Sequence, residues 1–205
     1  MSLSLVAAFW VISILFVVAP GADWAYAITA GLRHRSVLPA IAGLLAGHLT
    51  ATLVVAVGVA AIVTRTPLAL TAITAAGALY LVWLGAGTLA HPAEPRAETT
   101  SVDESPVRRA LRGYAISGLN PKVLLLFLAL LPQFTEPHAG WPVAAQILLL
   151  GLVHVGNCGV IYTAVGTGAR AVLTTRPTAA RAVSRFPGVA MVAIGIALLV
   201  ERFMH

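Results

Sequence analysis

Six long apolar segments constrain the fold of this chain more than any other feature of its sequence. Each is about 20 residues long, the length that an α-helix needs to cross about 30 Å of hydrocarbon. They cover residues 3–27, 38–63, 68–90, 113–132, 142–168 and 187–203. Only 10% of the residues are charged, against about 25% in a soluble domain. The sequence therefore predicts an all-α membrane protein with six transmembrane helices.

The first apolar segment shares one feature with a secretory signal peptide, because residues 19–22 faintly resemble a cleavage site. A signal peptide needs a positively charged region before its apolar run. No lysine or arginine precedes this segment, and the first one is Arg33. We therefore expect the segment to be retained as the first transmembrane helix.

The arginines are distributed unevenly among the loops. Ten lie in the first, third and fifth loops, namely Arg33, Arg35, Arg96, Arg108, Arg109, Arg112, Arg170, Arg176, Arg181 and Arg185. The other two are Arg65 and Arg202. Because cytoplasmic loops are enriched in Lys and Arg, these three loops should face the cytoplasm and both termini the opposite side. No basic cluster is interleaved with aromatic residues, so we expect no nucleic-acid partner despite the net charge of +6.

A polar linker, residues 92–107, divides the chain into halves of similar layout, residues 1–91 and 108–205. In each half the first span carries a proline next to a charge, the second a histidine and the third several glycines. Three spans per half make the second half run opposite to the first. Inverted repeats with broken helices recur in secondary transporters, with the site near the middle of the bilayer. We therefore expect one transmembrane domain, residues 1–205, made of two inverted three-helix repeats.

Two charged residues lie inside apolar segments, each shortly after a proline. Asp23 follows Pro20, and Lys122, the only lysine, follows Pro121. A charge at membrane depth costs about 2.5–3.5 kcal/mol on insertion scales, so such groups are functional candidates. Proline frees backbone groups, which is tolerated where protein or a water-filled cavity satisfies them. We therefore expect the first and fourth helices to be broken at these places.

The two breaks together can form a site for a zwitterion. Half-helices that begin at a break offer free N–H groups and positive dipole ends, which attract carboxylates. Asp23 would then bind an ammonium group and Lys122 a carboxylate. The predicted substrate-binding residues are Pro20, Gly21, Asp23, Asn120, Pro121 and Lys122. The alternative is a structural Asp23–Lys122 ion pair at two kinked helices.

A second predicted polar site consists of His48, in the second span, and of His154 and Asn157, which share one face of the fifth. A histidine can carry a proton during transport. The alternative is a hydrogen bond between helices, worth about 0.6 kcal/mol in membranes. Gly43 and Gly47, spaced four residues apart, predict a close contact between two helices.

No sequence pattern indicates enzyme, metal or cofactor chemistry. Serine, histidine and acidic residues do not recur at useful spacing, and the glycines at 166–168 lack the context of a phosphate loop. The single cysteine, Cys158, excludes an intrachain disulfide and has no zinc-ligand spacing. We therefore expect no enzymatic activity, no metal and no cofactor.

Three segments have the order and spacing of known exporter motifs. Pro-Gly-Ala-Asp stands at 20–23, Gly-Ala-Leu-Tyr-Leu-Val-Trp-Leu-Gly at 77–85, and Asn-Pro-Lys at 120–122 is followed by Phe-Leu-Ala-Leu-Leu-Pro-Gln-Phe at 127–134. Over nearly its whole length the chain resembles the LysE/RhtB family of bacterial amino-acid exporters. The resemblance implies export of amino acids or derivatives such as lysine, threonine, homoserine, its lactone or leucine. It also implies a multi-pass homodimer, surrounded by lipid in the bacterial cytoplasmic (inner) membrane, with periplasmic termini and coupling to the proton gradient.

Two positions depart from the family pattern. Ala22 replaces the second proline of Pro-Gly-Pro, and His48 stands where members often have an acid, so the identity of the substrate does not transfer. A second function stays open, in which the protein handles lipid or has a structural role and Asp23 pairs with Lys122. A polar cavity that joins Asp23, Asn120 and Lys122 would favour transport, whereas a groove open to the bilayer would favour lipid.

Overall fold

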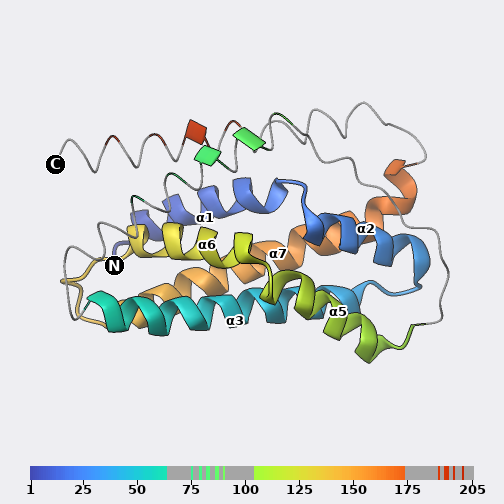
Figure 1. Cartoon of the computed structure of the whole chain (residues 1–205), viewed down its shortest axis with the longest axis horizontal. Coiled ribbons are helices and arrows are strands. Elements are labelled where there is room, and N and C mark those ends of the chain that lie inside the picture. Colours follow the sequence, from blue (N-terminus) through green and yellow to red (C-terminus); the bar gives the residue numbers. More distant parts are fainter. Residues whose placement is uncertain are drawn as a thin grey trace.

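A computed structural model describes residues 1–63 and 104–173, together with isolated helical positions in two further segments. The described residues form six α-helices and one 3-10 helix (Figure 1). They are α1 (Leu3–Val18), α2 (Ala22–Arg33), α3 (Leu38–Val63), α5 (Pro106–Gly118), α6 (Pro121–Leu130), η1 (Leu131–Phe134) and α7 (Val143–Leu173). Helices α3 and α7 are each long and apolar enough to cross a membrane, and two bent helix pairs can each supply one more span. The predicted all-α membrane protein is confirmed.

The first predicted break is confirmed between α1 and α2, which are bent by 62° relative to each other. Pro20 has no N–H to continue a helix, and Gly21 is extended, with φ −161° and ψ −161°. The indole Nε1 of Trp24 donates a 2.7 Å hydrogen bond to the carbonyl oxygen of Val17. This bond satisfies one of the acceptors that the end of α1 leaves open. The helical path then continues to Arg33, beyond the predicted end of the first span.

The second predicted break is confirmed between α5 and α6, where the chain bends by 51°. Helix α6 begins at Pro121, because the fixed backbone of proline suits the first position of a helix. The N–H of Asn120 donates to the carbonyl oxygen of Ser117 at 3.3 Å, and the carbonyl oxygen of Asn120 accepts from the N–H of Val123 at 3.1 Å. Short-range backbone hydrogen bonds therefore close this turn.

The two bent pairs run in opposite directions through the bundle (Figure 1). The carboxyl ends of α2 and α7 and the amino ends of α3 and α5 gather at one end of the molecule. The described arginines belong to the ends of α2, α5 and α7 found there or to the loop after α2. Helix α5 begins earlier than the predicted fourth span, because Ser105 caps it by accepting a 3.3 Å hydrogen bond from the N–H of Arg108. The predicted spans 68–90 and 187–203 lie outside the described residues apart from the isolated helical positions. The repeat boundaries therefore stay a prediction.

Helices α3 and α5 approach each other through small residues. A methyl group added at Gly43 would overlap the carbonyl oxygen of Ala110, and one at Gly47 would lie 2.8 Å from Cβ of Ser117. Only glycine fits at these two positions, since real Cβ atoms do not approach their neighbours so closely. The predicted close contact at Gly43 and Gly47 is confirmed, and α5 is the partner helix. This contact holds Ser117, at the end of α5, directly against α3.

Two apolar clusters form the described core and leave a polar layer between them. On α3, the buried His48 separates Leu44 of one cluster from Ala51 of the other. On α7, the buried His154 likewise stands between residues of the two clusters. Both histidines therefore occupy the same level of the bundle, with apolar packing on either side of them.

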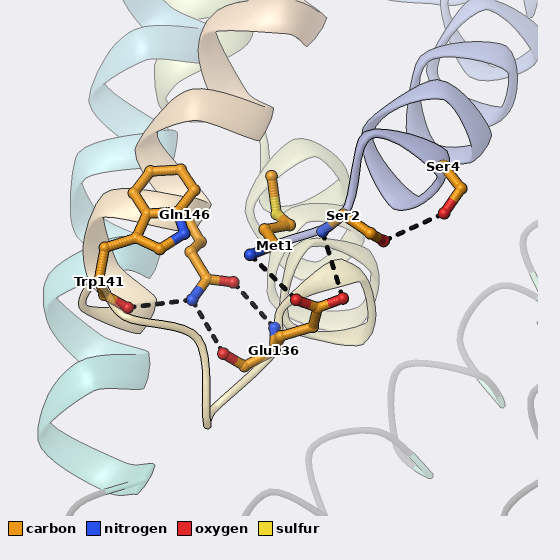
Figure 2. Close-up of polar contacts among 6 residues, drawn as sticks. All are labelled: Met1, Ser2, Ser4, Glu136, Trp141 and Gln146. Atoms are coloured by element: carbon orange, nitrogen blue, oxygen red, sulfur yellow. Dashed lines mark hydrogen bonds and ion pairs between the residues drawn. The ribbon is translucent and has the colours of Figure 1, made fainter.

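The opposite end of the molecule is closed by residues 135–142, which connect η1 to α7 (Figure 2). The carboxylate of Glu136 lies 2.9 Å from the amino group of Met1 and accepts a 3.2 Å hydrogen bond from the N–H of Ser2. The fully buried side chain of Gln146 holds the connection from inside. Its Oε1 accepts from the N–H of Glu136 at 2.8 Å, and its Nε2 donates to the carbonyl oxygens of Glu136 and Trp141 at 2.9 and 3.1 Å.

Candidate functional site

Asp23 lies in the first turn of α2, directly after the first break, and only 9% of it is exposed. Three other helices surround its carboxylate. Ser117 of α5 donates a 2.8 Å hydrogen bond to Oδ1, and Tyr162 of α7 donates a 3.2 Å hydrogen bond to Oδ2. Nε2 of His48, on α3, lies 3.3 Å from Oδ2. That distance suits an ion pair, although Nε2 has no hydrogen-bond partner among the described groups. A charge that is costly at membrane depth thus has polar partners from three other helices.

The bond from Ser117 to Asp23 joins the two breaks. Ser117 is in the last turn of α5, before the second break, and Asp23 is in the first turn of α2, after the first break. Half-helices from opposite halves of the sequence therefore meet at one carboxylate. The prediction that the two breaks face each other is supported by this contact.

The predicted second polar site is continuous with the Asp23 site. The ring centroids of His48 and His154 are 5.3 Å apart. Nδ1 of His154 lies 2.9 Å from Oγ of the buried Ser13, on α1, and Nδ2 of Asn157 donates to the same oxygen at 2.9 Å. One polar layer therefore crosses the bundle from α1 through α7 and α3 to α2.

A small cavity of about 50 Å³ lies between the two breaks. Five of the site residues predicted from the sequence line this cavity, namely Gly21, Asp23, His48, Asn120 and His154. Liquid water occupies about 30 Å³ per molecule, so the cavity has room for one or two waters. Backbone and side chains from both breaks, and both histidines, therefore face the same space.

The remaining predicted residues have different positions. Pro20 is buried in the first break and is not part of the cavity lining. Pro121 and Lys122 form the first turn of α6, but their side chains lie outside the described part of the chain. The predicted meeting of Lys122 with Asp23 therefore stays a prediction. Among the described groups, Asn157 contacts the layer through Ser13, and it also donates to the carbonyl oxygen of Trp10 at 3.5 Å.

Sequence reasoning missed three polar residues of this layer, Ser13, Ser117 and Tyr162. A signal for Tyr162 was present, because His154, Cys158 and Tyr162 follow one another at intervals of four and so share one face of α7. Ser117 and Ser13 carry no such signal, since serines are common in membrane helices. Their role is visible only once α1 and α5 are packed.

The same face of α7 brings metal-binding residue types together. His48, His154 and Cys158 each offer one ligand atom, and these three atoms lie within 4.8 Å of one another. Within the described residues this is the one group of three such side chains. Sequence spacing does not predict it, because His48 comes from a different helix.

A second, larger cavity of about 240 Å³ opens between α2 and α5 at the arginine-rich end. Its lining includes Tyr26, Arg33, Glu104 and Arg112, and Ala22 lines both cavities. Nε and Nη2 of Arg33 are buried without a hydrogen-bond partner among the described residues. A polar space with two guanidinium groups therefore lies next to the small cavity.

Comparison with known proteins gives a consistent set of relatives. The pattern of the LysE type translocator family matches residues 14–202. A membrane protein of Vibrio cholerae serotype O1, described as uncharacterized, is 36% identical over 151 residues, which are 72% of each chain. The homoserine/homoserine lactone efflux protein of Salmonella typhimurium is 30% identical over 162 residues, 78% of each chain. The leucine efflux protein of Klebsiella pneumoniae is 27% identical over 150 residues, 71% of each chain. No solved structure matches the chain.

Proposed function

The chain belongs to the LysE type translocator family, and on that premise we propose that it exports an amino acid or a close derivative from the cytoplasm. As a translocator it is a transport protein and not an enzyme. Two of its relatives are named as efflux proteins for homoserine and its lactone or for leucine. The observation that carries the proposal is the buried Asp23 carboxylate, which faces a cavity between two helix breaks.

In this proposal the breaks bind the two ends of a zwitterion. Asp23 receives the ammonium group, and Lys122 receives the carboxylate with help from the free N–H groups at the start of α6. Pro20, Gly21 and Pro121 keep the helix ends open for the solute. The cavity supports this reading over a lipid-handling role, since Asp23 and Asn120 line it together among five helices.

Loading requires the site to widen. The small cavity holds one or two waters, and even a small amino acid needs more space. The bends at the two breaks are the proposed hinges, because a proline interrupts the helical hydrogen bonding at each. The larger cavity next to Ala22 is the proposed entrance from the cytoplasm, where Arg33 and Arg112 attract the carboxylate of the solute. The arginine-rich end is then cytoplasmic and both termini are periplasmic in the bacterial inner membrane.

We also propose proton coupling and a homodimer, as the family resemblance implies. His48 is the candidate proton carrier, because its ring lies 3.3 Å from the carboxylate that would bind the substrate ammonium. Protonation of the pair and binding of the ammonium group would then compete for the same negative charge.

Efflux of a panel of labelled amino acids from whole cells tests the proposal. Asp23→Asn and Lys122→Gln should each abolish efflux of the transported solute while the protein still inserts and purifies. The double variant Asp23→Lys with Lys122→Asp separates binding from structure. A swapped ion pair keeps its attraction, whereas a swapped substrate site opposes the dipole of the zwitterion. Restored efflux would therefore overturn the binding roles and favour the structural pair.

A further inference from the structure

We propose that His48, His154 and Cys158 form a binding site for a borderline-soft transition-metal ion such as Zn²⁺. Their ligand atoms lie within 4.8 Å of one another, on α3 and on adjacent turns of α7. The exposed fractions are 3% for His48, 4% for His154 and 0% for Cys158. Imidazole nitrogen and thiolate sulfur are the ligands that zinc prefers in proteins.

Each histidine has one ring nitrogen next to an oxygen, through a hydrogen bond in His154 and an ion-pair distance in His48. Nδ1 of His154 lies 2.9 Å from Oγ of Ser13, which leaves Nε2 for a metal. Nε2 of His48 lies 3.3 Å from a carboxylate oxygen of Asp23, which leaves Nδ1. Neither ring nitrogen of His48 makes a hydrogen bond to a described group, although the ring is buried. Metal-binding histidines usually have such an oxygen partner, which fixes the ring and its tautomer.

The distances require only small adjustments. Zinc binds nitrogen at about 2.0–2.1 Å and sulfur at about 2.3 Å, so tetrahedral ligands lie about 3.5 Å apart. Rotation of the three side chains can shorten the separation of their ligand atoms from at most 4.8 Å to this value. His48 and His154 both line the small cavity, which has room for a water as the fourth ligand.

The charges favour a divalent ion in this position. Binding displaces the thiol proton of Cys158 to solvent and leaves a thiolate, as metal binding to cysteine does. The thiolate and the nearby Asp23 carboxylate then balance the two positive charges of Zn²⁺. A neutral assembly is far less costly inside a membrane than an uncompensated charge.

The competing interpretation is ordinary packing. A buried cysteine often acts as a small apolar side chain. The ring of His154 also packs edge-on against Phe127, with centroids 4.9 Å apart. In that case the three side chains would meet without binding an ion.

Cobalt(II) added to the purified, metal-free protein in detergent distinguishes the two. Cys158 is the only cysteine, so a thiolate-to-cobalt charge-transfer band can arise only from it. We expect this band together with the intense visible bands of tetrahedral Co²⁺, and we expect Zn²⁺ to remove both. Wild-type protein that shows no thiolate band with excess Co²⁺ would overturn the proposal, without the need for any variant.

Variants identify the metal ligands and test the serine that bonds to one of them. Cys158→Ser should lose the thiolate band, and His48→Gln and His154→Gln should each lose the tetrahedral spectrum. His138→Ala is the matched control, because this exposed histidine lies outside the cluster and its removal should change nothing. Ser13→Ala should weaken binding about 10- to 100-fold, the usual effect of removing a partner of a metal-binding histidine. A thiolate band that persists in both glutamine variants would mean binding by cysteine alone and would also overturn the site.

Discussion

Two carboxylates, Asp23 and Glu136, are each held by several groups, yet their surroundings differ. Asp23 lies inside the bundle and depends on side chains from α3, α5 and α7. Glu136 lies at the end of the bundle, its side chain is 40% exposed, and its partners are the amino group of Met1 and the backbone of Ser2. Bulk water can replace a lost partner of the exposed Glu136, whereas Asp23 meets at most the small cavity that it lines. The number of partners is therefore a poorer guide to importance than burial.

The largest expected effect comes from removing the buried charge. Asp23→Asn keeps the shape of the side chain but removes the charge that would bind an ammonium group. A hydrogen bond to a charged group contributes about 1.5–3 kcal/mol, so we expect efflux to fall at least tenfold. The matched change Glu136→Gln should leave efflux near the wild-type rate. Equal losses in the two variants would contradict the contrast drawn between the two carboxylates.

The next effect should come from a single partner of Asp23. Ser117→Ala removes the hydroxyl that links the two breaks, while Tyr162 and His48 remain. A hydrogen bond to a charged group contributes about 1.5–3 kcal/mol, but two partners remain to compensate, so we expect efflux to fall about two- to tenfold. Ser4→Ala is the control, because Ser4 is exposed and bonds only to the hydroxyl of Ser2 among the described groups. Unchanged efflux in Ser117→Ala would mean that the link between the breaks has no part in transport.

At the Glu136 end, the important side chain should be the buried Gln146. Gln146→Leu leaves the N–H and carbonyl of Glu136 and the carbonyl of Trp141 without this partner. Each buried unpaired group costs about 1–3 kcal/mol, so we expect a clearly lower thermal midpoint of the purified protein with transport retained in cells. Gln133→Leu is the matched control, since among the described groups the Gln133 side chain bonds to the carbonyl oxygen of Ala129, four residues earlier, and not to residues 135–142. Equal loss of stability in both variants would argue against a special role for residues 135–142.

The smallest effect is expected from Glu136 itself, and it should depend on pH. The ion pair with the amino group of Met1 lowers the pKa of the Glu136 carboxyl below its ordinary value of 4.5. A lowered pKa in the folded state adds stability above that ordinary value, and the gain disappears as the pH falls through the lowered pKa. Glu136→Gln should therefore lower the thermal midpoint slightly at pH 7 and hardly at all at pH 3. High salt should reduce the difference, since the pair is exposed.

The sequence predicted the features that depend on local chemistry. Proline next to a charge located both breaks, and the spacing of Gly43 and Gly47 predicted a close helix contact. It did not predict which helix would pack there, or that Ser117 would meet Asp23 across 94 residues of chain. Such partners depend on the packing of whole helices, and single serines give no periodic signal. The cluster of His48 with Cys158 was missed for the same reason, because its members come from different helices.

The partners of Asp23 also set an order of events during synthesis. The first span enters the membrane before any of them exists, and the last, Tyr162, follows 139 residues later. Until Tyr162 is made the carboxyl group lacks at least one of its three partners, in a span for which a charge costs about 2.5–3.5 kcal/mol. We therefore expect nascent chains that end before α5 to hold their first span loosely, which accessibility to a protease in the opposite compartment would reveal. Because of the residue proposed to bind the substrate, stable insertion of the first span thus depends on completion of the rest of the chain.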